Sequence, residues 1–168
     1  YLLAGASLCG GKAYALLEKF FREFVKEATG QEKPLYKTLE KLAGDGKASC
    51  TGRENRKKLQ IETTFDGTRV HPEQTGSITN LSTDNFTPAA FVYGTLEGMS
   101  RELYQMYQTI QNGTGMQIKR MIGSGNGLRK NPVLCGIVEE MFGAKLALAE
   151  CEEEAATGAA LSSMQQDE

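Results

Sequence analysis

The sequence predicts an α/β fold in which helices pack on a small mixed sheet. Two observations indicate this class: apolar residues recur at helical spacing in several long segments, and short strand-like stretches alternate with helices in the last third of the chain. Such alternation is typical of parallel strands joined by helical crossovers. The 168 residues, 40% of them apolar, are enough for one hydrophobic core. A single domain spanning residues 1–168 is therefore expected.

A first helix is expected over residues 2–28, with Gly30 as its stop. Its apolar stripe comprises Leu17, Phe20, Phe21, Phe24 and Val25. Three glycines, Gly5, Gly10 and Gly11, fall inside this segment. A glycine in a helix interior costs about 1 kcal/mol against alanine, so the close approach of another backbone or of a ligand is expected to require them.

A short helix is predicted at residues 34–44, because a proline stands at its start. The polar, turn-rich residues 45–58 are predicted to form a loop, and their basic cluster of Arg53, Arg56, Lys57 and Lys58 is expected to be solvated. Period-2 alternation predicts a strand at 59–65, and a second short strand is expected at 77–81.

A long helix is predicted from near Thr87 to the glycines at 113 and 115. Its apolar stripe, expected to be core, consists of Val92, Leu96, Met99, Leu103, Met106 and Ile110. Gly94 and Gly98 lie on a neighbouring face and should let another element approach closely. The rest of the chain predicts a strand at 116–123, a helix at 132–142, a strand at 145–149 and a helix at 152–163.

The bulk properties favour a cytoplasmic protein that binds neither nucleic acid nor membrane. The net charge of −2 offers no basic surplus to neutralise phosphates. No apolar run approaches the ~18 residues of a membrane span, and no signal peptide is recognised. The cysteines at 9, 50, 135 and 151 are spaced too widely for a metal knuckle and suggest buried, reduced thiols. His71 is interpreted as a loop residue.

A glycine-rich stretch, "IGSGNGLRKNP", lies between a predicted strand and a predicted helix. In α/β sheets, ligands bind at the carboxyl ends of strands. Gly123, Gly125 and Gly127 would let the main chain approach a phosphate or a polar base edge. The amides of Asn126 and Asn131 can supply hydrogen bonds. The stretch is therefore a candidate nucleotide site.

The competing interpretation is a simple strand-to-helix turn. Asn131 followed by Pro132 is a good helix start, with Asn131 as the cap and nothing more. The glycine spacing fits neither the dinucleotide fingerprint nor the phosphate loop. The pattern alone leaves both interpretations open.

The stretch "MIGSGNGLRKNPVLCGIVEEMFGAKLALAECEEEAATGAAL" resembles the final segment of the FGGY carbohydrate kinases. Upstream, "YLLAGASLCGGKAYALLEKF" is similar to the helix that opens this half of the family. "TTFDGTRVHPEQTGSITNLSTDNFTPAAFVYGTLEGMSREL" is similar to the family's G-E-R-x-x-P segment and the long helix after it. The three blocks stand in the family's order and cover nearly the whole chain. Within the family, "GTRVHP" and "GSGNGLRKN" look most like the sedoheptulokinases.

The resemblance implies an actin-like, ribonuclease-H-like fold of two lobes with ATP bound between them. This chain would be part of the C-terminal, nucleotide-binding lobe. The family positions that contact the nucleotide match Gly11, Gly123, Gly125, Asn126 and Asn131. The sugar-binding residues and the catalytic aspartate would lie in the N-terminal lobe, so no catalytic residue and no metal ligand is assigned here.

The implied activity is phosphorylation of a ketose by ATP with Mg²⁺, with this chain inactive by itself. Phosphoryl transfer depends on groups placed on both sides of a cleft. Two positions depart from the family pattern: Thr68 stands where glutamate is usual, and Ser124 and Asn126 replace members of a G-G-G-A string.

Two alternatives remain open at this point. One is a binding or regulatory module that keeps the kinase-lobe fold without catalysis, and the other is an unrelated α/β domain whose glycines only form turns. Because the first helix is expected to face strands from elsewhere in the lobe, exposed apolar surface and self-association are expected.

Overall fold

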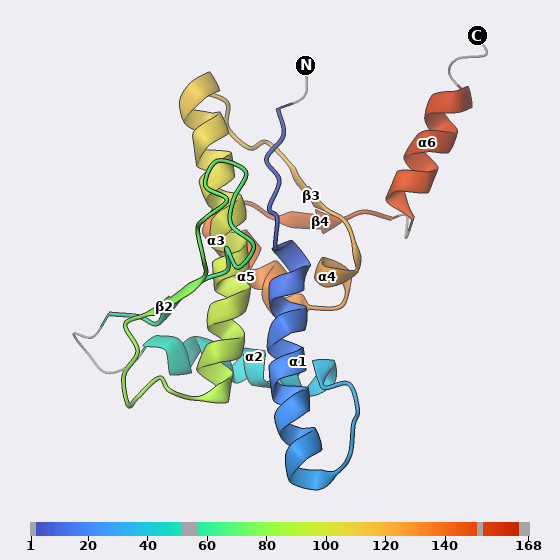
Figure 1. The fold of residues 1–168 in the computed structure, drawn as a ribbon. Coiled ribbons are helices and arrows are strands. Elements are labelled where there is room, and N and C mark those ends of the chain that lie inside the picture. The colour runs from blue at the N-terminus through green and yellow to red at the C-terminus, as the bar shows by residue number, and fades with distance from the viewer. Residues whose placement is uncertain (1–2, 52–56, 151–152, 165–168) are drawn as a thin grey trace. The chain divides into compact units, whose positions relative to one another are not determined.

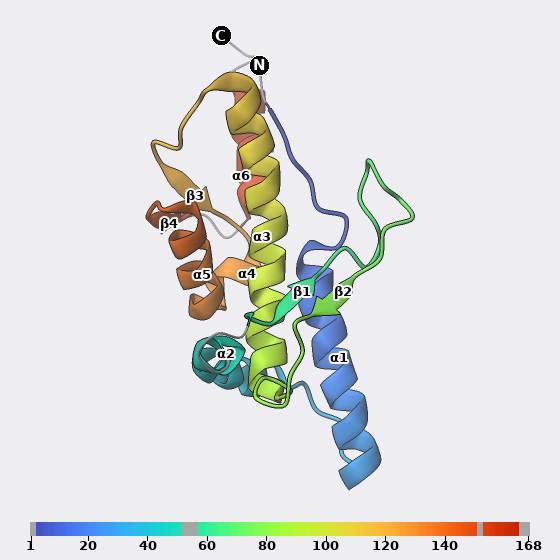
Figure 2. The ribbon, with the colours of Figure 1, turned by 90° about the vertical axis from the view of Figure 1, so that its left-hand side faces the viewer.

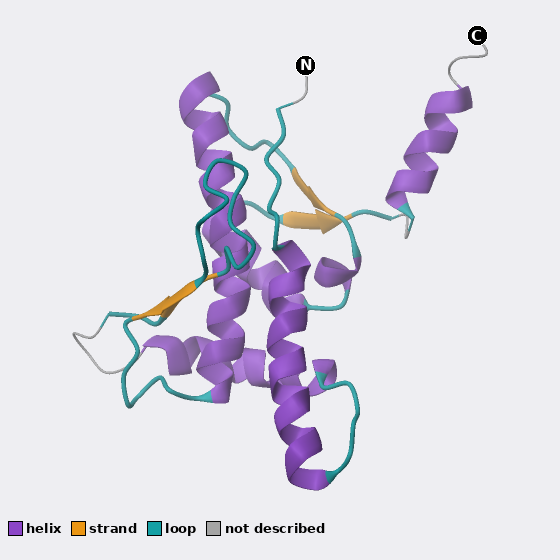
Figure 3. Cartoon of the chain, in the orientation of Figure 1, coloured by secondary structure: helices purple, strands orange, loops and turns teal. Residues whose placement is uncertain are grey.

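The computed structural model describes residues 3–51, 57–150 and 153–164 (Figure 1). The chain divides into two compact units, Tyr1–Met116 and Gln117–Glu168. Helices dominate the described residues, and short strands accompany them in both units (Figure 3). The predicted mixed α/β class, with helices packed on small sheets, is confirmed.

The first unit contains α1 (Gly10–Thr29), α2 (Tyr36–Thr51), β1 (Gln60–Glu62), β2 (Ser77–Thr79) and α3 (Pro88–Thr114). The strands β1 and β2 pair antiparallel, and Ile61 lies opposite Ile78. The helices α1 and α2 and the strand β1 all contact α3 (Figure 2). Around α3 they enclose a core that includes Ala13, Leu39, Cys50, Leu59, Val92 and Leu96.

The helix α3 begins and ends as its sequence predicts. The Thr87 hydroxyl accepts a hydrogen bond from the backbone N–H of Ala90, and Pro88 occupies the first turn. Gly115 ends the helix with a φ of 69°, a left-handed conformation that suits glycine. The apolar stripe is buried only in the first half of the helix: Val92 and Leu96 are inaccessible to solvent, whereas Leu103 is 46% exposed.

Gly94 and Gly98 of α3 bring β1 close to the helix, as their position predicts. A Cβ at Gly94 would lie 3.1 Å from Cδ1 of Ile61. A Cβ at Gly98 would overlap the backbone carbonyl oxygen of Ile61. Glycine is therefore required here for backbone approach.

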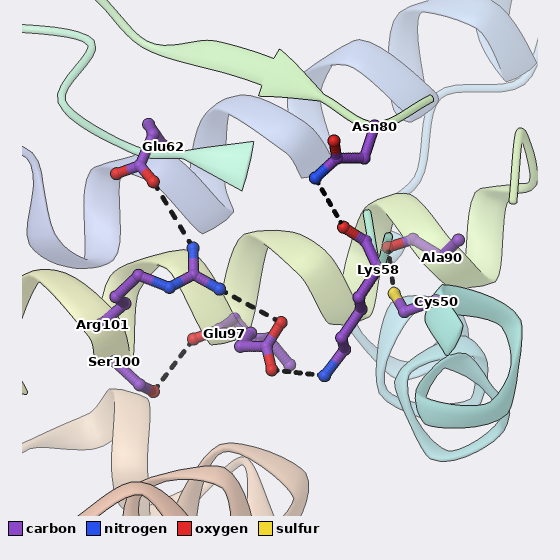
Figure 4. Close-up of polar contacts among 9 residues, drawn as sticks. Cys50, Lys58, Glu62, Asn80, Ala90, Glu97, Ser100 and Arg101 are labelled. Carbon is purple, nitrogen blue, oxygen red and sulfur yellow. Dashed lines mark hydrogen bonds and ion pairs between the residues drawn. The ribbon is translucent and has the colours of Figure 1, made fainter. Parts of the chain in front are cut away.

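A polar network fixes the chain before β1 to α3 (Figure 4). The Lys58 ammonium lies 2.5 Å from a Glu97 carboxylate oxygen, and it lies 5.4 Å from the centre of the Tyr93 ring. The Arg101 guanidinium pairs with both Glu97 and Glu62, at 3.4 and 3.5 Å. The prediction of a solvated basic cluster is thus wrong for Lys58, whereas Arg53 and Arg56 lie outside the described residues.

Two helix boundaries differ from the prediction. Helix α1 begins at Gly10 rather than at residue 2, so Gly5 is not helical. Gly5 packs against the Met106 side chain, because a Cβ added at Gly5 would lie 2.9 Å from the Cβ of Met106. Helix α2 continues through Gly44 and Gly46 to Thr51, where a loop is expected. A Cβ at Gly46 would overlap the Tyr93 side chain and the Ala89 carbonyl, so tertiary packing against α3 overrides the weak local helix propensity.

The second unit contains β3 (Met121–Gly123), α4 (Asn126–Arg129), α5 (Pro132–Phe142), β4 (Leu146–Leu148) and α6 (Glu154–Met164). The strands β3 and β4 pair in parallel, with Gly123 opposite Leu148. The helix α5 connects them and packs on β4, so the expected parallel strands with a helical crossover are present. The four strands among the described residues are shorter than predicted, at three residues each.

None of the helices in the described part of the chain combines the length and apolarity needed to cross a bilayer.

Candidate functional site

The glycine-rich turn lies where the parallel strands end. Strand β3 ends at Gly123 and strand β4 at Leu148, so the residues that follow both strands lie at one edge of the pair. The backbone N–H of Ala149 donates to the Gly123 carbonyl at 2.8 Å, which holds the two strand ends together. This is the edge at which α/β folds bind ligands.

Gly123 is closely packed within its own unit. It is buried, and a Cβ there would lie 2.8 Å from Cδ1 of Leu128 and 3.0 Å from Cδ1 of Leu146. Any larger residue would push these leucines aside. This close packing favours a small residue at position 123 independently of any ligand.

Gly125 and Asn126 form the open part of the turn. Gly125 has φ 90° and ψ 158°, a combination that is essentially restricted to glycine. No described atom lies within 4 Å of an added Cβ at Gly125 or at Gly127. Asn126 and Gly127 are exposed, so the main chain here is accessible to a ligand.

The short helix α4 closes the turn, and no pattern in the sequence predicts it. Its hydrogen bonds run from the N–H of Arg129 to the Gly125 carbonyl at 3.2 Å and from the N–H of Lys130 to the Asn126 carbonyl at 3.1 Å. The Cys135 thiol donates to the Leu128 carbonyl at 3.2 Å, and burial raises the pKa of this thiol above its ordinary value. Only four residues form the helix, too few for a periodic pattern to reveal it.

Asn131 caps α5. Its side-chain oxygen accepts a hydrogen bond from the backbone N–H of Leu134 at 3.0 Å, and the residue is 6% exposed. Pro132 follows in the first turn. The capping role that the sequence suggests for Asn131 is therefore present, and that role occupies its amide oxygen.

Gly11, the remaining predicted nucleotide residue, lies in the other unit, in the exposed first turn of α1. The Ser7 hydroxyl accepts hydrogen bonds from the N–H groups of Cys9 and Gly10, at 3.2 and 2.8 Å. It thereby ties the chain before the helix to its first turn. No described atom lies within 4 Å of an added Cβ at Gly11.

An ion pair stands next to Gly11. The Lys12 ammonium lies 2.7 Å from an Asp66 carboxylate oxygen. This hydrogen bond raises the pKa of Lys12, so the ammonium is charged throughout the physiological range. No sequence pattern indicates this pair, because its members are 54 positions apart.

The structure therefore brings four of the five predicted residues onto one turn: Gly123, Gly125, Asn126 and Asn131. Two of the four, Gly125 and Asn126, are accessible there. Thr68, which stands in place of a family glutamate, has a local role: its hydroxyl accepts from the N–H of His71 at 2.9 Å. Among the residues described, no group of three or more His, Cys, Asp or Glu side chains is arranged to hold a metal ion.

A family model described as the FGGY family of carbohydrate kinases, C-terminal domain, matches residues 1–165. No curated protein matches the chain significantly. Several solved structures share the fold. A xylulose kinase from Rhodospirillum rubrum aligns with a TM-score of 0.64 and 22% identity, over 82% of this chain and 25% of its own.

Two further solved structures align comparably. A xylulose kinase from Bifidobacterium adolescentis gives a TM-score of 0.62 and 19% identity, over 84% of this chain and 25% of its own. A glycerol kinase from Plasmodium falciparum, solved with ADP, gives a TM-score of 0.62 and 16% identity, over 82% of this chain and 26% of its own. The chain spans about a quarter of the length of each of these three proteins.

Proposed function

We propose that this chain, which belongs to the FGGY family of carbohydrate kinases, is the ATP-binding C-terminal part of a longer enzyme that phosphorylates a sugar. The family match over residues 1–165 carries the proposal. It is supported by a glycine turn at the carboxyl edge of the parallel strands with accessible main chain at Gly125 and Asn126. We further propose that both units belong to one lobe and that the protein is cytoplasmic.

We expect the turn to accept a nucleotide through its shape and its hydrogen-bonding groups. The absence of a Cβ at Gly125 leaves space on one side of the main chain, so a flat base or a phosphate can approach the turn. The side chain of Asn126 is exposed beside it and offers both a donor and an acceptor. Gly11 is proposed to face the phosphates, with the Lys12 ammonium nearby.

The roles assigned to this chain are binding and orientation. The sugar site and the catalytic base are proposed to lie in an N-terminal lobe outside the chain, so the chain alone is expected to be inactive. Mg²⁺ commonly reaches kinase sites through one or two carboxylates and the phosphates of the nucleotide, where it neutralises the charge that develops during transfer. No residue of this chain is assigned as its ligand.

The proposed acceptor is a ketose of the sedoheptulose type, from the resemblance of "GTRVHP" and "GSGNGLRKN" to that branch of the family. A panel of sedoheptulose, xylulose and glycerol, assayed at equal concentration with the full-length enzyme, tests this choice. Preference for xylulose would refute the sedoheptulose assignment, and preference for glycerol would refute the ketose assignment as well, while either result leaves the kinase proposal intact.

Substitutions at Asn131 in the full-length protein test the nucleotide site. Asn131→Ala removes the cap and should destabilise the protein by about 1 kcal/mol, whereas Asn131→Ser keeps a capping oxygen. If the amide nitrogen also contacts ATP, both variants raise the Michaelis constant for ATP, and Asn131→Ser does so without loss of stability. The nucleotide role of Asn131 is wrong if Asn131→Ser leaves this constant unchanged while the sugar kinetics stay normal.

The alternative is a non-catalytic module with the same fold. Such a protein would bind ATP in a direct titration but would transfer no phosphate to any sugar of the panel. Replacing Gly125 with valine in the full-length protein separates the kinase and the non-catalytic module from a domain whose glycines only form a turn. For the kinase and the module, Gly125→Val weakens ATP binding. For the domain without a nucleotide site, the parent protein already fails to bind ATP.

A further inference from the structure

Two asparagines of the chain, Asn112 and Asn126, are each followed by a glycine. Such a pair is chemically reactive, because glycine has no side chain that keeps its backbone nitrogen away from the asparagine side chain. The nitrogen can attack the side-chain amide carbon, and loss of ammonia then converts the asparagine into an acid. Both asparagines and both glycines are exposed, so exposure does not distinguish one pair from the other.

The pair of Asn112 and Gly113 is restrained by a long helix. It lies in the last turn of α3, a helix of 27 residues, where each backbone N–H bonds the carbonyl four residues earlier. The N–H of Gly115 continues this pattern with a hydrogen bond of 2.7 Å to the Gln111 carbonyl. The backbone nitrogen of Gly113 is therefore engaged, and the attack requires that the last turn of α3 opens first.

The pair of Asn126 and Gly127 lacks this restraint. Gly127 is the second residue of α4, and the N–H groups of a first helical turn have no partner within their own helix. The carbonyl four residues earlier, that of Gly123, accepts the N–H of Ala149 instead. No hydrogen bond joins the Gly127 N–H to another of the described residues, so its nitrogen is available for the attack.

The helix α4 also opens easily. It has four residues, and the hydrogen bonds that the N–H groups of Arg129 and Lys130 donate measure 3.2 and 3.1 Å. A single helical turn is marginal by itself, because few hydrogen bonds offset the fixing of its backbone angles. The Asn126 side chain is exposed and forms no hydrogen bond with another described residue. It can therefore turn toward the Gly127 nitrogen whenever α4 opens.

We propose that Asn126 is a site of spontaneous deamidation. The Gly127 nitrogen forms a bond to the side-chain carbon of Asn126, the carbon–nitrogen bond of the side-chain amide breaks, and ammonia leaves with the proton of the Gly127 amide. Water then opens the resulting succinimide ring at either carbonyl, so residue 126 becomes aspartate or isoaspartate. The reaction consumes only water and needs no enzyme.

The modification acts on the turn that is proposed to bind the nucleotide, and this consequence rests on the proposed function. An asparagine side chain offers a donor and an acceptor, whereas an ionised aspartate only accepts. The new carboxylate repels the phosphates of ATP, and isoaspartate also lengthens the main chain next to Gly125. The converted protein is therefore expected to bind ATP several-fold more weakly than the parent protein.

Incubation of the full-length protein at mildly alkaline pH, followed by peptide mass spectrometry, tests the proposal. The peptide with Asn126 should gain the mass difference between a hydroxyl and an amide group several-fold faster than the peptide with Asn112. In urea the two rates should become similar, because the folded structure causes the difference. Gly127→Ala should slow the conversion of Asn126, since its methyl group obstructs the attack. Equal rates in the folded protein, or a difference that persists in urea, would overturn the proposal.

ATP separates the modification from the nucleotide assignment. If the turn binds ATP, saturating ATP should slow the conversion of Asn126 and leave that of Asn112 unchanged. Asn126→Asp, which reproduces one product, should raise the Michaelis constant for ATP several-fold. Preferential conversion of Asn126, without protection by ATP and with an unchanged Michaelis constant in Asn126→Asp, refutes the nucleotide role of this residue alone. A raised Michaelis constant in Asn126→Asp, without preferential conversion in the parent protein, refutes the modification alone.

Discussion

Replacing Gly125 by alanine should destabilise the second unit through backbone strain alone. The residue has φ 90° and ψ 158°, and holding a non-glycine residue in such a region costs of order 1–3 kcal/mol. Apart from the two neighbouring residues, no described atom lies within 4 Å of the added methyl group, so packing against other residues adds nothing to this strain.

Gly127 provides a matched control two residues away. It lies inside α4, an added Cβ also meets no described atom, and its φ lies outside the left-handed range. Gly127→Ala should therefore stabilise by about 0.4–1 kcal/mol, because alanine restricts the unfolded chain. The two variants are expected to change stability in opposite directions.

The assay is urea unfolding of the full-length protein, followed by hydrogen exchange of the amides at residues 121–150. Gly125→Ala should lower the midpoint and speed exchange in this segment, whereas Gly127→Ala should raise the midpoint slightly. Equal stability of the two variants would show that the left-handed conformation of Gly125 does not persist in solution. The reasoning about the shape of the turn would then be wrong.

Three further predictions concern the first unit. Gly98→Ala should destabilise by about 1–3 kcal/mol through overpacking, because its Cβ overlaps a carbonyl of β1, while Gly113→Ala on the same helix meets no described atom and should not destabilise; thermal unfolding compares them. Glu18→Ala should destabilise by about 1–3 kcal/mol, because the buried carboxylate accepts the N–H of Leu35 at 3.0 Å, and Glu18→Gln, which keeps that acceptor, should recover most of the loss in a denaturant titration. Burial, the largest cause, raises the pKa of the Cys50 thiol to about 11, so its contribution to stability is complete below about pH 8.5, where the unfolded thiol titrates, and disappears as the pH rises toward the folded value. Urea midpoints over this alkaline range should fall less in Cys50→Ala than in the parent protein, and an identical fall would contradict the assignment.

Helix ends with a strong local cause were predictable from sequence, and those set by distant contacts were not. The start of α3 at Thr87 and the stop of α1 at Gly30 depend on a hydroxyl cap and a left-handed glycine, which local sequence encodes. The extension of α2 through Gly44 and Gly46 depends on packing against α3. Local propensity contains no information about that partner.

The candidate site was predictable in outline because chain order alone places a glycine turn after a strand and before a helix. The physical reason for the residue type at each position became clear only from the three-dimensional structure. Gly123 packs closely against two leucines, Gly125 is required by its backbone angles, and Asn131 is already engaged as a cap. The short helix α4 and the pairing of Lys12 with Asp66 involve too few residues or too great a separation for a sequence pattern.

Gly11 is the position at which a ligand would explain most. Its φ is outside the left-handed range and its added Cβ meets no described atom, so neither backbone strain nor packing within the first unit requires glycine there. Free space around a glycine does not by itself identify a binding site, since a Cβ added at Gly136 in the middle of α5 also meets no described atom of another element. The distinction is thermodynamic: alanine at either position should stabilise the free protein by about 0.4–1 kcal/mol. If the phosphates approach the first turn of α1 as proposed, alanine at Gly11 alone should also weaken ATP binding, because its methyl group would obstruct them. If both variants bind ATP like the parent protein, the first turn of α1 has no part in the nucleotide site.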